Sequence, residues 1–413
     1  MLLFSSLTSL SMHLTRGDHW TRGPACSGQS QHMAGGCSER QVGPPPHEAA
    51  GRTLACGPIA VALTSNDVAA SNWLSEFLEP WFTPTVQRPE WRVRLSSSND
   101  AYAELCDRLP PTAPARPCFA RDRQTLSLPA WTQSEGVIVA DTERSCFMIA
   151  RQFAIDMVSD PVTRRWRFAL MWAVREIAAT RLRHTHLDIH AAAVEVCGRA
   201  ILITGPKGAG KTTLSVYLMR NGHCRLIAND RVFAGGAATC CAVRGMPTAI
   251  NIRPATLAQF PELGSGLPRV KRPYLYTADE LCELIDRDDS PASTELALSP
   301  AQLARQLRVE PVGSAPLGAI VFPEIRGDVE GWVVERLAPK DVGAGIWANL
   351  YGDQSSGRAA TLFEDLDGGP RVPSRSLAMA LAAGVPGFRI VLGRNAYAAG
   401  DGASRLLELL VAS

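Results

Sequence analysis

Lysine is scarce in this chain of 413 residues, because only four of its 42 basic residues are lysines and the rest are arginines. The charges nearly cancel, since 40 acidic residues leave a formal net charge of +2, and no dense basic run occurs. A chain without a net field or a basic stripe is a poor candidate for binding nucleic acid. We therefore expect no nucleic-acid partner.

Long apolar runs and paired cysteines are also missing. No segment approaches the roughly 18 to 20 apolar residues that a membrane helix needs, and the first residues lack the basic start and small-residue cleavage site of a signal peptide. The 11 cysteines form no CxxC pair and no zinc-like spacing with histidine, which is typical of reduced thiols. These absences predict a cytoplasmic protein with no membrane partner.

The apolar pattern divides the chain into three parts, as its length favours. Residues 1–50 are rich in Gly, Ser, Pro, His and Gln without an apolar period, so we expect a disordered or mis-annotated N-terminal extension. Residues 51–183 contain several strand-like runs and a helical run at 69–81, which predict an N-terminal α+β module. Residues 184–413 alternate strand and helix signals and predict an α/β domain with a C-terminal extension.

One helical segment and one loop stand out within these parts. The segment 161–187 places Trp166, Leu170, Val174 and Ile177 on one helical stripe, which predicts a core or domain-docking helix. The segment 353–372 is rich in turn residues, and we expect a surface loop there.

A glycine-rich segment, GPKGAGKT at 205–212, fits the pattern G-x-x-x-x-G-K-[ST] and holds two of the four lysines. It follows an apolar strand candidate and opens a helix, which is the setting that a nucleotide site requires. Its glycines let consecutive N–H groups face a phosphate at the positive end of the helix. The sequence thus predicts a P-loop that binds nucleotide through Gly205, Pro206, Lys207, Gly208, Ala209, Gly210, Lys211, Thr212 and Thr213.

Single side chains of this segment have distinct expected roles. Lys211 would reach the β and γ phosphates, and the Thr212 hydroxyl would ligate Mg²⁺. Lys207 lies at the crown of the loop, as a second phosphate contact or as a solvated charge. ATP and Mg²⁺ are therefore the expected cofactors.

An acidic residue completes the predicted site early in the chain. Asp230 follows Lys211 by nineteen residues, where the next strand candidate ends. A carboxylate at that edge of a sheet can bind the metal or take the proton of an attacking hydroxyl. We expect Asp230 to serve one or both functions.

Four segments between 189 and 252 carry a family resemblance: IHAAAVEV, AILITGPKGAGKTTL, NGHCRLIANDRV and AVRGMPTAINI. In this order they resemble the catalytic domain of HPr kinase/phosphorylase and its HPr-kinase-related relatives. The resemblance implies a P-loop kinase core of the HPr kinase and phosphoenolpyruvate carboxykinase type. It also implies transfer of phosphate from ATP, with Mg²⁺, to a serine hydroxyl.

The resemblance also assigns residues. His190 occupies the family's active-site histidine position, and Asp230 matches the second member of an Asp-Asp pair whose first position holds Asn229 here. An amide cannot act as a base, so Asp230, His190 or Glu195 is left for that role. The catalytic set implied is Asp230, His190 and Lys211, with Thr212 and Asp230 on the metal. Glu195, Asn229 and Arg244 are candidate contacts to substrate or phosphate.

The acceptor remains open at this stage. The first 180 residues do not resemble the family's regulatory domain, so a serine of another protein or of a ribosomally made peptide is favoured over HPr. We do not expect the reverse, phosphorylase activity, and the resemblance makes a homo-oligomer plausible. Two alternatives stay open: a kinase for a small metabolite on the same core, and a non-catalytic nucleotide-binding switch.

Overall fold

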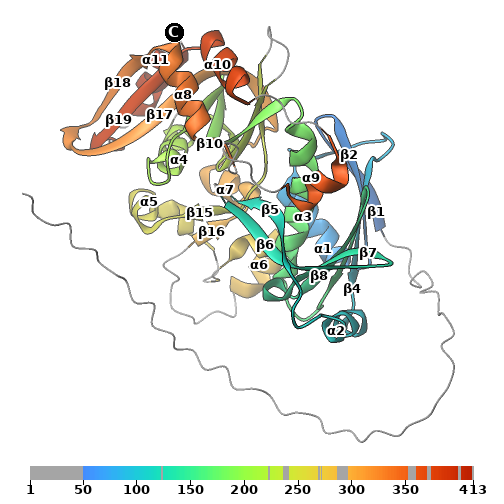
Figure 1. Ribbon diagram of the computed structural model, residues 1–413. Coiled ribbons are helices and arrows are strands. Elements are labelled where there is room, and N and C mark those ends of the chain that lie inside the picture. The colour runs from blue at the N-terminus through green and yellow to red at the C-terminus, as the bar shows by residue number, and fades with distance from the viewer. Residues whose placement is uncertain are drawn as a thin grey trace, which may run out of the picture. The chain divides into compact units, whose positions relative to one another are not determined.

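The computed structural model describes most of the chain after residue 49. The described residues are 50–121, 124–221, 224–235, 241–267, 270, 272–285, 296–351, 360–369, 374–398 and 401–411. The predicted N-terminal extension lies outside them, apart from Ala50. The described residues form a mixed α/β fold whose strands gather mainly in two sheets (Figure 1).

Nine strands of the described chain form the first sheet. They are β1 (Ala50–Cys56), β2 (Ile59–Ser65), β3 (Thr83–Pro84), β4 (Trp91–Ser97), β5 (Ala115–Arg121), β6 (Gln124–Gln133), β7 (Gly136–Asp141), β8 (Cys146–Arg151) and β9 (Ala154–Ser159). Their order is β3-β1-β2-β4-β9-β8-β7-β6-β5, with β2–β4 and β4–β9 parallel. β1 and β2 form a hairpin, because Gly57 turns the chain with a φ of 63°.

Eight described strands form the second sheet. They are β10 (His186–Val196), β11 (Arg199–Thr204), β12 (Arg225–Ala228), β13 (Arg231–Gly235), β14 (Ala242–Gly245), β17 (Ser314–Glu330), β18 (Trp332–Leu337) and β19 (Gly387–Arg394). The order is β11-β10-β13-β14-β17-β19-β18, with β12 on β10 and β17 also parallel to β11. β10 is buried along nearly its whole length, including its polar residues Asp188, His190 and Glu195.

The remaining elements connect and cover these strands. A short separate sheet pairs β15 (Ile250–Ile252) with β16 (Leu296–Leu298). The helices are α1 (Val68–Leu78), α2 (Asn99–Asp107), α3 (Trp166–Leu182), α4 (Lys211–Asn221), α5 (Pro254–Gln259), α6 (Ala278–Ile285), α7 (Pro300–Leu307), α8 (Pro339–Ala348), α9 (Leu362–Asp367), α10 (Ser374–Gly384) and α11 (Gly402–Val411), with short 3₁₀ turns η1 (Thr142–Arg144), η2 (Pro261–Gly264) and η3 (Pro273–Leu275).

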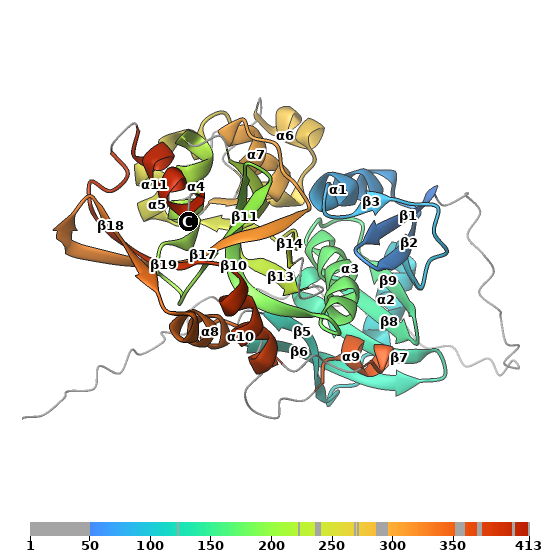
Figure 2. The same ribbon diagram turned by 90° about the horizontal axis from the view of Figure 1, so that it is seen from above.

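The helix α3 lies between the two sheets (Figure 2). It contacts β2, β5 and β9 of the first sheet and β10 of the second. The predicted stripe of Trp166, Leu170, Val174 and Ile177 is buried, and so is most of the opposite face. A helix that is buried nearly all round belongs to a core, so the prediction of a core helix is confirmed.

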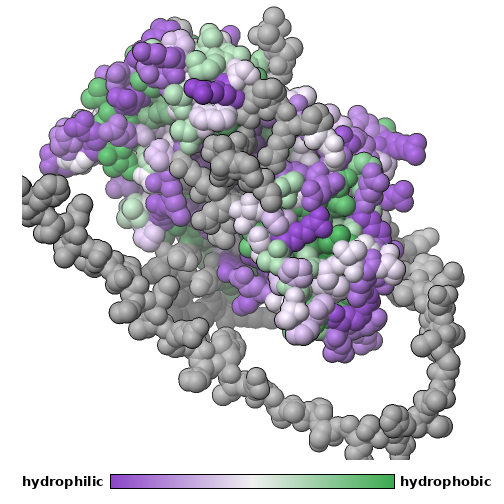
Figure 3. Space-filling model, viewed as in Figure 1, coloured by the Kyte–Doolittle hydropathy of each residue, from purple (hydrophilic) through white to green (hydrophobic). Residues whose placement is uncertain are grey.

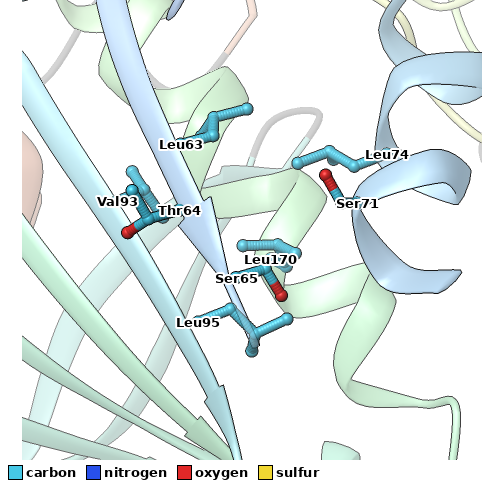
Figure 4. Close-up of a pocket in the computed structure, with 8 residues that line it drawn as sticks. All are labelled: Leu63, Thr64, Ser65, Ser71, Leu74, Val93, Leu95 and Leu170. Carbon is cyan, nitrogen blue, oxygen red and sulfur yellow. The ribbon is translucent and has the colours of Figure 1, made fainter. Parts of the chain in front are cut away.

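The face of α3 toward the first sheet also packs against α1. Figure 4 shows Leu170 of α3 and Leu74 of α1 beside Leu63 of β2 and Leu95 of β4, around a cavity of about 20 Å³. Such a volume holds about one water molecule. This cavity is a packing gap and not a ligand site.

One prediction for the second half is wrong in part. The expected surface loop at 353–372 contains α9, in which Leu362 and Phe363 are buried. Thr361 and Glu364 form a capping box at its start, and the ring of Phe363 lies 5.4 Å from that of Phe119 on β5. The turn-forming residues around this short helix masked its signal in the sequence.

Hydrogen bonds from buried side chains join the first half of the chain to the second. Trp73 Nε1 donates to the Tyr274 carbonyl oxygen at 2.8 Å, and Trp81 Nε1 donates to that of Ile227 at 2.6 Å. The described residues within 47–413 accordingly form one compact unit. The sequence-based boundary between residues 183 and 184 stays a prediction.

In the view of Figure 3, hydrophilic residues are frequent near the exposed outer half of β17 and β18. Among the described residues, no helix has the length and apolar character needed to cross a membrane.

Candidate active site

Three segments meet near the middle of β10, at His190 and Ala191. The pairing of β10 with β11 places Ala191 opposite Thr204, so His190 lies beside the start of the glycine-rich loop. On the other side of β10, the chain turns from β12 into β13 through Asn229 and Asp230. The N–H of Ala191 donates to the carbonyl oxygen of Asp230 at 3.2 Å, which holds this turn against β10.

The glycine-rich loop leads from β11 into α4, whose first residue is Lys211. Gly208 and Gly210 have φ angles of 95° and 97°, which residues with a side chain rarely adopt. The ammonium group of Lys211 donates to the carbonyl oxygens of Gly205 and Pro206 at 2.8 and 3.2 Å. Lys211 therefore reaches back across the loop, at the N-terminus of the helix.

A cavity of about 480 Å³ lies in front of this loop. It brings together most of the residues singled out in the sequence, namely His190, Lys207, Gly208, Gly210, Lys211, Thr212, Thr213, Asn229 and Asp230. Gly205, Pro206 and Ala209 belong to the loop but do not line the cavity. The chain thus places loop, lysine, histidine and carboxylate around one space.

Asp230 and His190 form a pair at this cavity, with 3.2 Å between Asp230 Oδ1 and His190 Nε2. The Asp230 side chain is 39% exposed and His190 is buried. Burial opposes ionisation of Asp230, but the hydrogen bond from His190 and the charges of Arg175 and Lys211 outweigh it, so the pKa of Asp230 lies below its usual value. Asp230 is therefore a carboxylate at neutral pH, open to the cavity.

Oxygen atoms suited to Mg²⁺ face the same space. Thr212 and Asp230 both line the cavity, and the neighbouring Asn229 has a buried side-chain oxygen without a hydrogen-bond partner among the described residues. Hydroxyl, carboxylate and amide oxygens are the ligands that Mg²⁺ prefers, usually together with phosphate oxygens. The residues present thus fit this metal.

Arg231 fixes the turn that carries Asp230, and the sequence reasoning missed it. Its guanidinium donates to both carboxylate oxygens of Asp188 on β10, at 3.0 and 2.8 Å, and to Glu176 of α3 at 3.1 Å. It also lies under the ring of Tyr351, 4.5 Å from its centre. Arg231 thus anchors the turn that carries Asp230. It lies within the segment 221–232 quoted for the family resemblance, where it was assigned no role.

Further cavity residues come from the end of the last of the four family segments and from the residues just after it. Asn251, Arg253 and Thr256, on and after β15, line the wall that faces the loop. The hydroxyl of Thr256 is 2.9 Å from that of Thr213 on α4. Arg253 is the basic residue of this wall, within 4 Å of where a side chain on Gly208 would begin.

Two residues expected near substrate or phosphate are not brought to this site. Glu195 lies at the far end of β10, five residues from His190 and therefore roughly 16 Å along the strand. There it pairs with Arg225 and accepts from the N–H of Gly198 in the β10–β11 turn. Glu195 therefore stabilises the β10–β11 turn and does not reach the loop cavity.

Arg244 is also absent from the cavity lining. It lies on β14, opposite Phe233 of β13, with its guanidinium next to Gly57 in the β1–β2 turn. Its charge lowers the pKa of His186, after the larger effect of burial. The strand's alternation directs this side chain toward the first sheet, away from the loop.

Comparison with known proteins gives a partial sequence match. No family model matches the chain. Over 63 residues it is 40% identical to the HPr kinase/phosphorylase of Lactobacillus delbrueckii subsp. bulgaricus, which covers 15% of this chain and 19% of that protein. The match therefore spans about a fifth of the relative's length. The resemblance drawn from the motifs is confirmed as a distant and partial similarity.

Among solved structures, the Hpr(Ser) kinase/phosphatase from Coxiella burnetii aligns with 55% of this chain and 93% of its own. The identity is 11% and the TM-score 0.22.

Proposed function

We propose that this protein is an ATP-dependent kinase that transfers the γ-phosphate of ATP to a serine hydroxyl of a protein or a ribosomally made peptide. The observation that carries the proposal is the convergence of the glycine-rich loop, Lys211 and the Asp230–His190 pair on one cavity. The partial match to an HPr kinase/phosphorylase supports the same reaction class. Each group then has a defined part in phosphoryl transfer.

The loop would bind the triphosphate as a P-loop does. Its backbone N–H groups and the start of α4 offer donors and a positive dipole to the phosphate oxygens. Lys211 exchanges its contacts with two loop carbonyls for the β and γ phosphates. Thr212 and Asp230, with Asn229 beside them, would hold Mg²⁺, which when bound neutralises charge on the phosphate oxygens.

The transfer is a displacement at the γ-phosphorus. The serine oxygen forms a bond to phosphorus, the bond to the β–γ bridging oxygen breaks, and ADP leaves with that electron pair. The hydroxyl proton goes to Asp230 directly, or through Asp230 to His190, which is 3.2 Å away. Positioning and charge supply most of the rate in such a reaction, so a base as weak as an ionised Asp230 suffices.

The test is transfer of label from [γ-³²P]ATP, with Mg²⁺, to serine-containing proteins and peptides. Lys211→Ala should weaken ATP binding and lower transfer by about 100-fold or more, since the lysine contacts the transferred group. Asp230→Asn should lower transfer by about 10²- to 10⁴-fold while ATP still binds. Lys340→Ala, on the exposed start of α8, is the matched control and should behave as wild type.

The same experiment separates the alternatives. Label on a small metabolite and on no peptide would favour the metabolite kinase. Tight ATP binding without transfer to any acceptor would favour the nucleotide-binding switch and overturn the kinase proposal.

A further inference from the structure

A second cavity, of about 470 Å³, opens on the other side of Asp230 from the glycine-rich loop. The two cavities share Asp230, Ala249, Asn251 and Tyr351 as lining residues. The second one is built from both halves of the chain, with walls from η1, α3 and η3. Asp230 is thus the carboxylate at which the two spaces meet.

Arg175, on α3, is the notable group of this second cavity. Its side chain is 4% exposed, and among the described residues it forms no ion pair and its Nε has no hydrogen-bond partner. Its one described hydrogen bond goes to the sulfur of Met171, a weak acceptor. A buried guanidinium is normally paired with a carboxylate, so Arg175 departs from the rule.

The neighbouring arginines show the contrast. Arg183 and Arg231 are equally buried, and between them they pair with Glu176, Asp188 and Glu364. These three carboxylates thus pair with Arg183 and Arg231 and not with Arg175. Burial, and next the charge of Arg231, lowers the pKa of Arg175 to about 10, so it remains a cation at neutral pH.

Two further arginines line the same cavity. Arg272 is exposed, and its side chain makes no hydrogen bond or ion pair with the described residues. Arg144 is bound to Asp141 and lies over the ring of Trp172, 4.9 Å from its centre. The acidic side chains of the lining are Asp230 and Glu143, of which Glu143 is mostly exposed. The lining of the second cavity therefore carries more positive than negative charge.

An aromatic wall completes the cavity. The rings of Phe168 and Trp172 are 4.5 Å apart, and that of Tyr274 is 5.5 Å from Phe168. Such a wall offers a flat apolar surface beside the guanidinium groups.

We infer that this second cavity takes the acceptor, and that the acceptor carries an anionic group, a carboxylate or a phosphate, close to its reacting hydroxyl. Arg175 binds the anion in the interior, Arg272 attracts it at the mouth, and the hydroxyl then lies at Asp230. This inference rests on the proposed kinase function and adds the substrate class to it. In peptide terms, it means a serine with an acidic or phosphorylated neighbour.

The test uses an oriented library of serine peptides in which each flanking position is in turn Glu, Gln, phosphoserine or Ser. For the wild type, we expect kcat/KM for the best Glu peptide to exceed that of its Gln counterpart by about 10- to 100-fold, the usual effect of a hydrogen-bonded charge pair. A larger gain with phosphoserine would identify phosphate as the natural anion. Equal rates for all four series would overturn the inference.

Variants assign the effect to its residue. Arg175→Gln should abolish the preference for Glu over Gln and leave the KM for ATP within about twofold, because removing a buried, unpaired cation does not break an ion pair. Arg272→Gln should reduce the preference for Glu over Gln in part. Because Arg272 is exposed, this substitution should leave the fold intact. Arg405→Gln, exposed on α11, is the control that keeps it.

Failure of the two proposals can be told apart. Transfer to peptides with no dependence on flanking charge, or a preference that survives Arg175→Gln, contradicts the acceptor inference and leaves the kinase intact. If no peptide is phosphorylated at all, calorimetric binding of the Glu and Gln peptides to the wild type and Arg175→Gln still decides whether the cavity selects an anion.

Discussion

Among single residues, Asp230 is the one on which the site depends most. Its carboxylate meets the loop cavity on one side and the arginine-lined cavity on the other. Its pKa is kept low, against the effect of burial, chiefly by the hydrogen bond from His190. The two residues therefore act as a pair, and the pair can be tested through its pH dependence.

We expect His190→Ala to shift the acid limb of the kcat/KM profile to higher pH. In the proposed reaction, Asp230 can accept the proton only when it is ionised. The variant loses the donor that stabilises the carboxylate, so the pKa of Asp230 should rise. At pH values above this acid limb, the variant should keep part of the wild-type kcat/KM. The measurement is the profile of peptide phosphorylation from about pH 4 to 9 in wild type and variant. Loss of activity at every pH would instead identify His190 as the base.

At this scale, the sequence indicated some of the residues that line the loop cavity and not others. The grouping of His190, the glycine-rich loop and Asp230 could be expected, His190 from the family resemblance and Asp230 from its place just after the strand candidate that follows the loop's helix. The positions of Glu195 and Arg244 away from the cavity could not be predicted. The direction of a side chain depends on strand register and on which part of the strand lies beside the loop. The apolar periodicity of the sequence determines neither of these two features.

Among the structural elements, the loop between β11 and α4 makes the strictest demand on its sequence. Gly210 has a φ of 97°, and a side chain there would begin 3.2 Å from Ile325 on β17. Both backbone conformation and space are therefore limited. Gly331, in the β17–β18 turn, has a φ of 66° and open space around it.

We expect Gly210→Ala to abolish ATP binding, because relief of the strain must reshape the loop that presents its N–H groups. Gly331→Ala carries a similar backbone cost, about 1 kcal/mol, without touching the loop. Equilibrium binding of a fluorescent ATP analogue, with thermal unfolding as a check, compares the two. Equal binding by both variants would show that this loop does not hold the nucleotide.

The second cavity could not be predicted from the sequence, because the elements that form it are far apart along the chain. Its walls come from η1, α3 and η3, which are brought together by contacts between distant parts of the chain. The helix α3 was expected as a core helix, and Arg175 within it carried no signal beyond being a charge in an apolar segment. The short elements α5, α6 and α7 were likewise missed, because each spans too few turns for a clear period.

For the molecule as a whole, a buried ionic network links α3, β10, β13 and α9. Glu176 lies 2.9 Å from Arg183 and 3.1 Å from Arg231, and both arginines also contact Asp188. Burial disfavours the Glu176 carboxylate, but the two arginines lower its pKa to about 2. The network thus joins the helix between the sheets to β13, the strand that follows Asp230 directly.

We expect Glu176→Gln to lower the free energy of unfolding by about 3–5 kcal/mol, because it leaves buried arginine charge short of one carboxylate. The pKa of Glu176 is lower in the folded state than its ordinary 4.5, so its contribution is present above that pH and is lost as the pH falls toward 2. The variant should therefore lose stability less steeply over this acid range.

Urea unfolding at neutral and acid pH measures both effects. Glu335→Gln, which removes an exposed pair with Arg389, is the control and should cost at most about 0.5 kcal/mol. Equal stability of both variants at neutral pH would mean that the network does not hold the two sheets together.

The most direct test of the account is a crystal structure of the protein with Mg²⁺ and a non-hydrolysable ATP analogue. We expect the β and γ phosphates to lie in the loop from Gly205 to Thr212, with Lys211 turned onto them. The γ-phosphate should face Asp230 across a gap that a hydroxyl can fill. A nucleotide bound elsewhere, or a γ-phosphate directed away from Asp230, would contradict the account.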